Sequence, residues 1–333
     1  MGMFKKKMFT FVCFVAIFLT FYILYLQIRK PDYKQETKIK IVGAYIKSGI
    51  IKPSPLHHSN CDSEEVFLLI MIPSAVNNFE QRNAIRSTWG NSSMVQYSVL
   101  IKFVLGTTSN GTLQDIAETE NQIYNDILFE DISETYENLL WKSTAILRWV
   151  SRYCFRVRYL LKIDDDMFLN LPRLLNELEK HSYTNTILGC KVSHSSPFRY
   201  PYSKWVVSRE QYHKDYFPDY IAGTAYLITG DIIQKLYLAT QKVPYFKFED
   251  VYITGLCREH VGAIAKEHTG ISCGYRDKGP CGKNFRYEIT GHHYSPSEIK
   301  RMWGELQDRW SNCRFIDQYF IYKIVDLISF ISN

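Results

Sequence analysis

The sequence predicts an α/β domain with a mixed, largely parallel sheet flanked by helices. Two observations lead to this prediction. From residue 66 onward, short and continuously apolar runs alternate with longer polar or amphipathic segments, as in successive strand–helix units. The 333 residues are 46% hydrophobic and 22% charged, which supports a large core and excludes a disordered or fibrous chain.

Each strand and helix is predicted from its local pattern. The run Val66–Ile72 holds no polar residue, which is typical of a strand buried on both faces. Further strands are predicted over the apolar runs Ile101–Leu105, Ile127–Phe129 and Tyr159–Ile163. Helices are predicted between these runs, over Glu80–Trp89, Leu113–Tyr124 and Tyr136–Tyr153.

An apolar segment near the N-terminus predicts a membrane anchor. Met8–Ile28 is 21 residues long and carries no charge, and at about 1.5 Å per residue this length spans a bilayer. Its bulky end lacks the small-residue cleavage site of a removed signal peptide, so we expect an uncleaved signal anchor. Charges flank both sides, and the positive-inside rule gives weak support to a cytosolic N-terminus.

The remaining organisation follows from composition. A cytosolic tail (residues 1–7) and the anchor (8–28) precede a stem (29–64) that includes Pro53 and Pro55. One globular domain is expected over residues 65–314. The apolar last residues, 315–333, are expected to form a helix packed on the domain, and a second membrane span is the alternative.

Sequons and cysteines favour a lumenal globular domain. Asn91 and Asn110 each begin a glycosylation sequon. Of the eight cysteines, all but Cys13 lie beyond the anchor, and the absence of any CxxC pair favours disulfides over zinc. Their connectivity stays open. The odd number leaves a thiol that is either free or bonded to a second chain, which would allow a homodimer. The net charge of +6 forms no basic stripe, so nucleic acid is excluded as a partner.

Three consecutive carboxylates, Asp164–Asp166, directly follow the predicted strand Tyr159–Ile163. In open α/β sheets, ligands bind outside the carboxyl ends of the strands. Three adjacent carboxylates repel one another, and a Mg²⁺ or Mn²⁺ ion would relieve this repulsion. The alternative is a solvated acidic turn before a helix that begins near Asn170 and Pro172.

A second acidic pair, Glu249-Asp250, precedes the segment Val251–Cys257. If that segment is a helix, the pair lies at its N-terminus. A carboxylate in this position is either a general base or a helix cap.

Six motifs in chain order resemble those of one enzyme family. They are R-N-A-I-R-S-T-W-G at Arg82–Gly90, the block Glu120–Lys142, K-I-D-D-D-M-F at Lys162–Phe168, S-K-W-V-V-S at Ser203–Ser208, E-D-V at Glu249–Val251 and S-P-S-E at Ser295–Glu298. Together they resemble the β-1,3-glycosyltransferases, which include β-1,3-galactosyltransferases and Brainiac-type β-1,3-N-acetylglucosaminyltransferases. The resemblance covers about Val66 to Cys313.

The resemblance implies a GT-A-like catalytic domain in the Golgi lumen, held by a single-pass type II anchor in the Golgi membrane. It implies an inverting hexosyltransferase that moves a sugar from a UDP-sugar to the 3-hydroxyl of a glycan on a glycoprotein or glycolipid. We expect galactose from UDP-galactose. The alternatives are N-acetylglucosamine from UDP-N-acetylglucosamine, or a catalytically silent member that binds glycans.

The resemblance also implies residue roles. Asp164, Asp166 and His292 would hold Mn²⁺ or Mg²⁺ against the diphosphate, with His293 as the alternative to His292. Asp250 matches the general base, and Glu249 is its competitor. The residues expected to bind the donor are Arg82, Arg86, Asp126, Asn138, Lys162, Asp164, Asp165, Lys204, Trp205 and Glu249.

Several of these expectations have structural alternatives. Arg82 or Arg86 could instead form a salt bridge, and Asp126 and Asn138 could instead be structural. Lys204 and Trp205 could line either the donor or the acceptor cleft, and Trp89 is expected in the core.

The chain departs from the family pattern at a few positions. Ile132, Glu134 and Leu140 replace family residues in the second motif, and Ile221-Ala222 stand where many members have Cys-Ser. The missing cysteine puts the usual disulfide pattern in doubt. Gly255 follows E-D-V one residue later than in many members. None of these changes removes a carboxylate.

Overall fold

The computed structural model describes residues 61, 65–91, 96–133, 138–273 and 288–307, all of which belong to one compact unit, residues 40–333. Within them, no helix is long and apolar enough to cross a membrane. The expected anchor, the stem before Cys61 and the expected C-terminal helix lie outside the described residues.

The centre of the domain is a seven-stranded sheet with the strand order β3-β2-β1-β4-β7-β6-β8. Four strands on one side run parallel: β1 (Leu68–Pro73), β2 (Val99–Thr107), β3 (Ile127–Ser133) and β4 (Tyr159–Ile163). The other side adds β7 (Tyr220–Thr229), antiparallel to β4, then β6 (Thr186–Val192) and β8 (Ile264–Glu267). The predicted mixed, largely parallel sheet is therefore confirmed.

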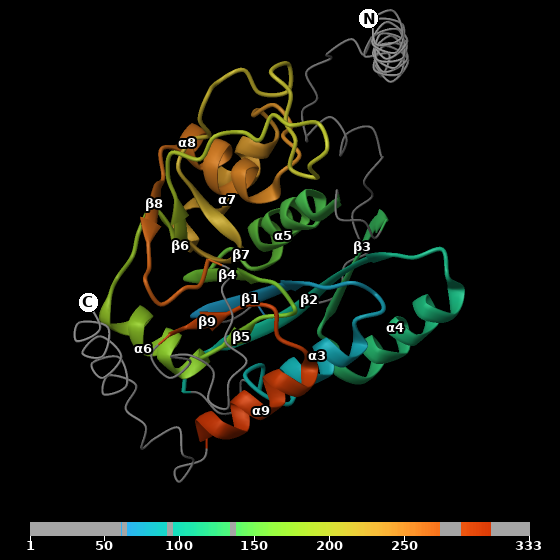
Figure 1. The fold of residues 1–333 in the computed structure, drawn as a ribbon. Coiled ribbons are helices and arrows are strands. Elements are labelled where there is room, and N and C mark those ends of the chain that lie inside the picture. Colours follow the sequence, from blue (N-terminus) through green and yellow to red (C-terminus); the bar gives the residue numbers. More distant parts are fainter. Residues whose placement is uncertain (1–60, 62–64, 92–95, 134–137, 274–287, 308–333) are drawn as a thin grey trace, which may run out of the picture. The chain divides into compact units, whose positions relative to one another are not determined.

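Helices cover both faces of the sheet (Figure 1). The helix α5 (Leu139–Tyr153) and the helix α7 (Gly230–Thr240) lie on one face. The opposite face carries α3 (Phe79–Arg86), α4 (Gly111–Tyr124), α6 (Leu171–Lys180) and α9 (Pro296–Gln307). Alternate residues of β1 enter the two cores, Leu69 and Met71 on the α5 side and Leu68, Ile70 and Ile72 on the other. This explains why the first apolar run contains no polar residue.

Local sequence sets the helix ends. Asn110 and Asn170 cap α4 and α6 through their side-chain oxygens, and Pro172 lies in the first turn of α6. The helix predicted to reach Trp89 ends at Arg86 instead. The Thr88 hydroxyl donates to the carbonyl of Ala84, and the Gly90 amide donates to that of Ile85. A Cβ at Gly90 would lie 2.6 Å from the Ile85 oxygen, so this tight turn requires glycine.

The segment Val251–Cys257 is a π-helix, η3, which continues into the short helix α8 (Arg258–Val261). A π-turn holds one more residue than an α-turn. The helix that was conditionally predicted here is present, but its hydrogen-bond pattern is not that of an α-helix.

Two disulfides confirm the prediction that cysteines pair in this chain. Cys61 pairs with Cys154, and Cys190 pairs with Cys273. Cys257 is a buried free thiol in the described part of the chain. The family cysteine that Ile221 replaces is therefore not needed for either bond.

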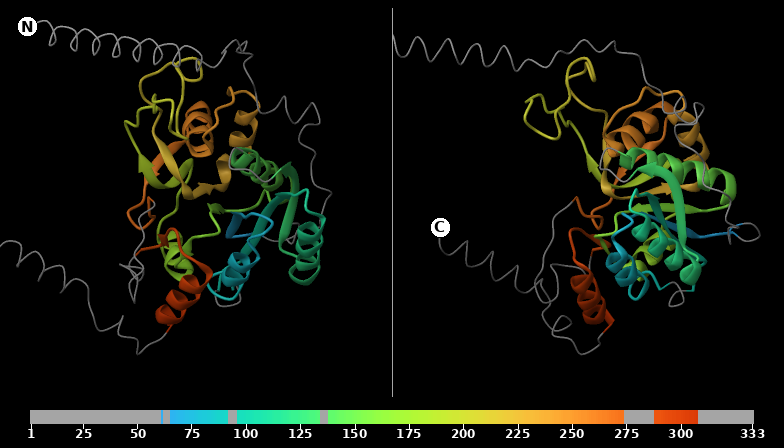
Figure 2. Two further views of the ribbon diagram at one scale, coloured as in Figure 1. Left: turned by 45° about the vertical axis from the view of Figure 1, so that its right-hand side comes forward. Right: turned by 90° about the vertical axis from the view of Figure 1, so that its right-hand side faces the viewer.

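A small second sheet and a long loop complete the fold. The strands β5 (Phe168–Leu169) and β9 (Thr290–Gly291) pair antiparallel, which joins chain segments more than a hundred residues apart. The loop between β6 and β7, coloured yellow, extends beyond the end of the sheet (Figure 2).

Candidate active site

A cavity of about 640 Å³ opens where β1 and β4 end, at the carboxyl edge of the parallel strands. Its walls come from the β1–α3 connection, the start of α5, the acidic triplet and His292. The lining residues are Pro73, Ser74, Ala75, Val76, Asn77, Thr108, Leu113, Leu139, Lys142, Asp164, Asp165, Asp166 and His292. The acidic triplet thus lies at the edge where an α/β sheet binds its ligand.

The three aspartates of the triplet have different partners. Asp165 accepts hydrogen bonds from the Ser74 hydroxyl (2.6 Å) and the Asn78 amide (2.9 Å), so its carboxylate holds the β1–α3 connection in place. Burial raises the pKa of Asp165, and these hydrogen bonds oppose that shift.

Asp164 forms an ion pair with Lys162, whose ammonium nitrogen lies 2.5 Å from Oδ1. The same nitrogen donates to the carbonyl of Gly223 (2.6 Å) on the neighbouring strand β7. Lys162 is 1% exposed. Its burial disfavours the charge, but Asp164, Glu249 and then Asp250 outweigh this effect and raise the pKa of Lys162. A buried, charged lysine therefore connects the acidic triplet to the second acidic pair.

Asp166 lies beside two histidines. Its carboxylate oxygens are 3.5 Å from His292 Nε2 and 3.1 Å from His293 Nδ1. The possible ligand atoms of the three residues all lie within 4.8 Å of one another. The β5–β9 pairing and the Tyr294 amide, which donates to the Asp166 carbonyl, bring these distant segments together. One carboxylate and two imidazoles form a donor set that fits a divalent cation.

The predicted ligand set is therefore brought together only in part. Asp166 and His292 are adjacent, and His293, the alternative to His292, joins both of them. Asp164 lies on the same cavity wall but pairs with Lys162 and falls outside this cluster.

The second acidic pair lies at the start of η3. The Glu249 carboxylate is 6% exposed and accepts a hydrogen bond from the Tyr226 hydroxyl (2.5 Å). Asp250 Oδ1 accepts from the Val251 amide (2.8 Å), so Asp250 caps η3. A helix cap was one of the two alternatives predicted for this pair, the other being a general base. Burial raises the pKa of both carboxyl groups. A higher pKa suits a group that accepts a proton near neutral pH.

Gly223 lets this pair approach β7. A Cβ at Gly223 would lie 3.3 Å from both Asp250 Cβ and Glu249 Oε2. The missing side chain leaves room for the two carboxylates beside the carbonyl that Lys162 contacts.

Arg82 and Arg86 belong to an ion-pair network behind the cavity wall. Arg82 is fully buried, pairs with Glu120 (2.6 Å) and donates to the carbonyls of Ala75 (2.6 Å) and Val76 (3.1 Å). Because Ala75 and Val76 line the cavity, Arg82 fixes the shape of that wall. Its guanidinium group forms a salt bridge, which was the structural alternative to donor binding.

Arg86 and Asp126 pair through two hydrogen bonds of 2.7 and 2.8 Å. Arg86 also contacts Glu120 and lies over the rings of Phe103 and Tyr124. Asn138 donates to Ser133 near the start of α5. None of Arg82, Arg86, Asp126 and Asn138 lines the cavity in the described residues, so their direct contact with a donor stays a prediction.

Lys204 and Trp205 lie on the loop between β6 and β7. The Lys204 ammonium is 4.7 Å from the centre of the Trp205 ring, which contacts Phe248 edge-on at 5.5 Å. Phe248 directly precedes Glu249, so Trp205 lies on the side of the second acidic pair. Trp89 is fully buried in the core, as predicted.

Sequence reasoning did not place Lys142 or Tyr226 in the site. Lys142 is 5% exposed, lines the cavity and donates to the carbonyl of Ser74 (2.8 Å). Its signal was its position at the end of the second motif, near the start of the predicted helix. Tyr226 gave no signal, because a tyrosine in a strand is ordinary core material.

Comparisons with known proteins agree with the motifs. Residues 80–269 match the family model described as galactosyltransferase. The chain is 29% identical to beta-1,3-galactosyltransferase 1 of Mus musculus, covering 75% of this chain and 77% of that protein. It is 33% identical to lactosylceramide 1,3-N-acetyl-beta-D-glucosaminyltransferase of Rattus norvegicus, covering 76% and 69%. It is 35% identical to beta-1,3-galactosyltransferase 5 of Homo sapiens, covering 64% and 69%.

Proposed function

Because the chain belongs to the galactosyltransferase family and is a β-1,3-glycosyltransferase, we propose that it moves galactose from UDP-galactose to the 3-hydroxyl of an acceptor glycan, with inversion. The acceptor is carried by a glycoprotein or a glycolipid. The observation that carries the proposal is the cavity at the strand ends. It joins the acidic triplet to His292, and through Lys162 it is linked to Glu249 and Asp250.

The cavity has the size that a nucleotide sugar requires. Its volume of about 640 Å³ lies within the usual range for small-molecule sites. Lys142 contributes a positive charge to the wall, which suits a diphosphate. This wall and a GT-A-like nucleotide-binding half are expected to hold the UDP part of the donor.

Asp166, His292 and His293 would hold a divalent cation, with Asp164 as the further ligand expected from the sequence. Imidazole nitrogens favour Mn²⁺ over Mg²⁺, which prefers oxygen ligands. When bound, such a cation acts as a Lewis acid toward the diphosphate. Burial raises the pKa of the Asp164 carboxyl group, and the Lys162 ammonium opposes that shift.

Asp250 is the proposed general base for the acceptor hydroxyl. A sugar hydroxyl is a weak acid, so its attack requires a carboxylate that takes up the proton. Glu249 is the less available of the two carboxylates as a proton acceptor, because it is buried and accepts a hydrogen bond from the Tyr226 hydroxyl. Asp250 Oδ1 accepts from the Val251 amide, and Oδ2 accepts no hydrogen bond from another side chain in the described residues. Glu249 instead positions the Lys162 ammonium.

The base assignment predicts different outcomes for the two carboxylates. Asp250→Asn is expected to lower kcat by roughly a hundredfold or more while UDP binding is retained. Glu249→Gln is the matched control and should retain more turnover. Steady-state transfer rates and calorimetric titration with UDP in Mn²⁺ measure the two effects. Near-normal transfer by Asp250→Asn would disprove the assignment.

The function itself is tested by donor-dependent UDP release. The full chain, purified in detergent with Mn²⁺, is given UDP-galactose, UDP-N-acetylglucosamine or UDP-glucose, each with and without a panel of sugar acceptors. Galactose transfer that is lost on chelation supports the proposal. Transfer with UDP-N-acetylglucosamine alone would favour the alternative suggested by the rat relative. UDP binding without any transfer would favour a silent glycan-binding member.

We further propose that the domain lies in the Golgi lumen behind a single-pass type II anchor. Asn110 is exposed, and its side-chain oxygen caps α4, while the sequon requires its nitrogen. Asn110→Asp therefore removes the sequon and keeps the cap. In a secretory host, this variant is expected to lose one glycan from the mass of the protein. An unchanged mass for Asn110→Asp, together with an unglycosylated Asn91, would contradict the lumenal placement.

A further inference from the structure

Four aromatic side chains are exposed on a short part of the loop between β6 and β7. The exposed fractions are 45% for Phe198, 73% for Tyr200, 88% for Tyr202 and 44% for Trp205. We call these four residues the aromatic platform. Exposure of several large rings within eight residues is unusual for a soluble surface, and it is typical of a surface that contacts a ligand.

The loop that carries the platform is held in one shape. Arg199 donates to four backbone carbonyls of the same loop, those of Val207, Ser208, Tyr212 and Lys214, at 2.8 to 3.0 Å. Phe198 also bridges to Val206, and the Val207 amide donates to the Phe198 carbonyl. The exposed rings are therefore presented by a built scaffold, which lowers the entropy cost of binding.

The platform is continuous with the second acidic pair. Trp205 contacts Phe248, and Phe248 contacts Phe246, each pair of ring centres being 5.5 Å apart. Phe246 in turn packs on Phe217 and Tyr212, which anchors the row to the interior. Since Phe248 directly precedes Glu249, the Trp205 end of the platform lies beside the second acidic pair, which includes the proposed base.

The position and chemistry of the platform indicate its ligand. An acceptor must bring its hydroxyl to Asp250, so its remaining sugars extend along the surface next to that residue. Pyranose rings have apolar C–H faces that pack on aromatic rings, and their hydroxyls take hydrogen bonds from lysines. Lys204 and Lys247 lie over the Trp205 and Phe248 rings, at 4.7 and 5.0 Å, and supply such donors.

We propose that the aromatic platform binds the inner sugars of an oligosaccharide acceptor, so that the enzyme prefers acceptors longer than one sugar. This inference rests on the proposed glycosyltransferase function and adds the acceptor class. Tyr200 and Tyr202 contact the sugars farthest from the reacting hydroxyl, and Trp205 contacts those nearest to it.

The test compares acceptor lengths. Acceptor KM and kcat are measured for a galactose monosaccharide glycoside, for a disaccharide of galactose and N-acetylglucosamine, and for the corresponding tetrasaccharide. The wild-type KM is expected to fall with length. In the Tyr200→Ala/Tyr202→Ala variant, the KM of the tetrasaccharide should rise roughly tenfold while that of the monosaccharide and the kcat values stay unchanged. Phe155→Ala, another ring that is 71% exposed, is the matched control and should behave as wild type.

A second measurement does not depend on turnover. Saturation-transfer NMR with the tetrasaccharide and no donor should show contact with the wild type and with Phe155→Ala, and reduced contact with the double variant. Equal contact in all three proteins, or an equal dependence on length, would overturn the platform. Binding of the wild type, but not of the double variant, to phosphatidylcholine vesicles without any effect of acceptor length would also overturn it in favour of a membrane contact. Absence of transfer with every donor and acceptor would instead refute the proposed function, and the NMR result would still test the platform.

Discussion

At the scale of single residues, Lys162 is the group that joins the two acidic clusters. Its ammonium contacts Asp164 and the Gly223 carbonyl, and it lies in the field of Glu249 and Asp250. Removing a buried cation leaves its carboxylate partners uncompensated, which is costlier than losing an exposed pair. Lys162 was predicted as a donor-binding residue, and that role stays a prediction.

Lys162→Met should therefore destabilise the folded domain. We expect a loss of about 3 kcal/mol in the free energy of unfolding, because the uncompensated carboxylates must then be neutralised. Lys235→Met, which changes an exposed lysine on α7, is the control and should shift stability by less than about 0.5 kcal/mol. Urea unfolding followed by fluorescence measures both variants, and equal stability of the two would show that Lys162 has no such role.

How much of the site could be predicted differs from residue to residue. The acidic triplet could be identified because adjacent carboxylates at the end of an apolar strand repel one another unless a cation neutralises them. Asp250 could be assigned as the base only through its match to the E-D-V motif of the family, because the acidic pair alone left a general base and a helix cap as alternatives. The choice between His292 and His293 needed the structure, which places both beside Asp166.

The ion-pair partners of Arg82 and Arg86 could not be identified from the sequence. Glu120 and Asp126 lie more than thirty residues further along the chain. They become adjacent to the two arginines only when α3 and α4 pack on the same face of the sheet. A salt bridge was therefore foreseeable as an alternative, but its partners were not.

At the scale of elements, the contact between α3 and α4 predicts a pH dependence of stability. Glu120 on α4 accepts from Arg82 and Arg86 on α3. Burial opposes ionisation of Glu120, but the two guanidinium groups outweigh it and lower the pKa below the ordinary value of 4.5. A lowered pKa in the folded state gives stability that is complete above pH 4.5 and is lost as the pH falls through the folded-state value.

The stability of the wild type should therefore decrease below pH 4.5 more steeply than that of Glu120→Gln, which cannot titrate. Glu118→Gln removes an exposed carboxylate on α4 and should keep the wild-type slope. The free energy of unfolding of each protein is measured at about eight pH values between about 3.5 and 7. Parallel curves for wild type and Glu120→Gln would show that the network does not hold α3 and α4 in this way.

The π-helix η3 is the element that fixes Asp250. The Thr254 hydroxyl lies 2.6 Å from the Asp250 carbonyl and 2.8 Å from the Ile221 carbonyl, and it accepts from the Ile221 amide. Thr254 is fully buried, so these contacts attach the start of η3 to β7, two residues before Gly223. The position of the proposed base thus depends on a hydroxyl one turn further along the chain.

Thr254→Val keeps the volume and removes the hydroxyl, so it is expected to lower kcat by roughly ten- to a hundredfold. Thr254→Ser keeps the hydroxyl and should restore most of the rate. The acceptor KM and the affinity for UDP should change little in either variant, which separates misplacement of Asp250 from general damage. If both variants lose activity equally, the side-chain volume matters and the hydroxyl does not.

Strands and helices could be predicted where the local pattern of apolar residues defines their ends. Tyr159–Ile163 was predicted with its observed ends, because an apolar run between charged residues leaves little freedom. The strand predicted over Ile127–Phe129 extends to Ser133, because pairing with β2 continues beyond the apolar residues. The π-helix could not be predicted from hydrophobic periodicity, since seven buried or nearly buried residues in a row carry no period.

At the scale of the whole molecule, the site is assembled from both halves of the sheet and from the small β5–β9 sheet. Asp164 directly follows β4, Gly223 lies on the adjacent strand β7, and His292 follows β9. The parallel half could be predicted from the alternation of strands and helices. The antiparallel strands β6 and β7 were not predicted. The β5–β9 pair could not be predicted, because strands of two residues carry no local pattern.

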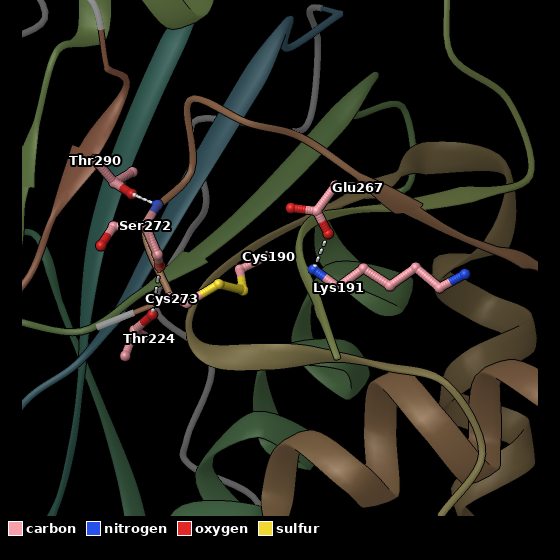
Figure 3. Close-up of a disulfide and its surroundings, with 7 residues drawn as sticks. All are labelled: Cys190, Lys191, Thr224, Glu267, Ser272, Cys273 and Thr290. Atoms are coloured by element: carbon pink, nitrogen blue, oxygen red, sulfur yellow. Dashed lines mark hydrogen bonds between the residues drawn. A yellow bond between two sulfur atoms is a disulfide. The ribbon is translucent and has the colours of Figure 1, made fainter. Parts of the chain in front are cut away.

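The segment Ser272-Cys273 connects these parts (Figure 3). The Thr224 hydroxyl donates to the Ser272 carbonyl (3.3 Å), and the Ser272 amide donates to Thr290 Oγ1 (2.9 Å) on β9. The Thr224 carbonyl accepts from the Asp164 amide. The Cys190–Cys273 disulfide fastens this segment to β6. The position of this segment therefore affects both Asp164, through Thr224, and the two histidines that follow β9, through Thr290.

The two disulfides should consequently have different effects on function. They close segments of similar length, with sequence separations of 93 for Cys61–Cys154 and 83 for Cys190–Cys273. Loss of either should therefore reduce stability by a similar amount, about 2–4 kcal/mol. Only the Cys190→Ala/Cys273→Ala variant should also weaken Mn²⁺-dependent UDP binding and transfer, because only this bond holds the segment between Thr224 and Thr290.

Cys61→Ala/Cys154→Ala is the control of matched loop length, measured at a temperature where both variants are folded. Calorimetric titration with UDP and Mn²⁺, together with transfer rates, separates the two variants. Equal UDP affinity in both would mean that the hydrogen bonds of Ser272 hold the segment without the disulfide. The site would then depend on the pairing of β5 with β9, and the cross-link would serve stability alone.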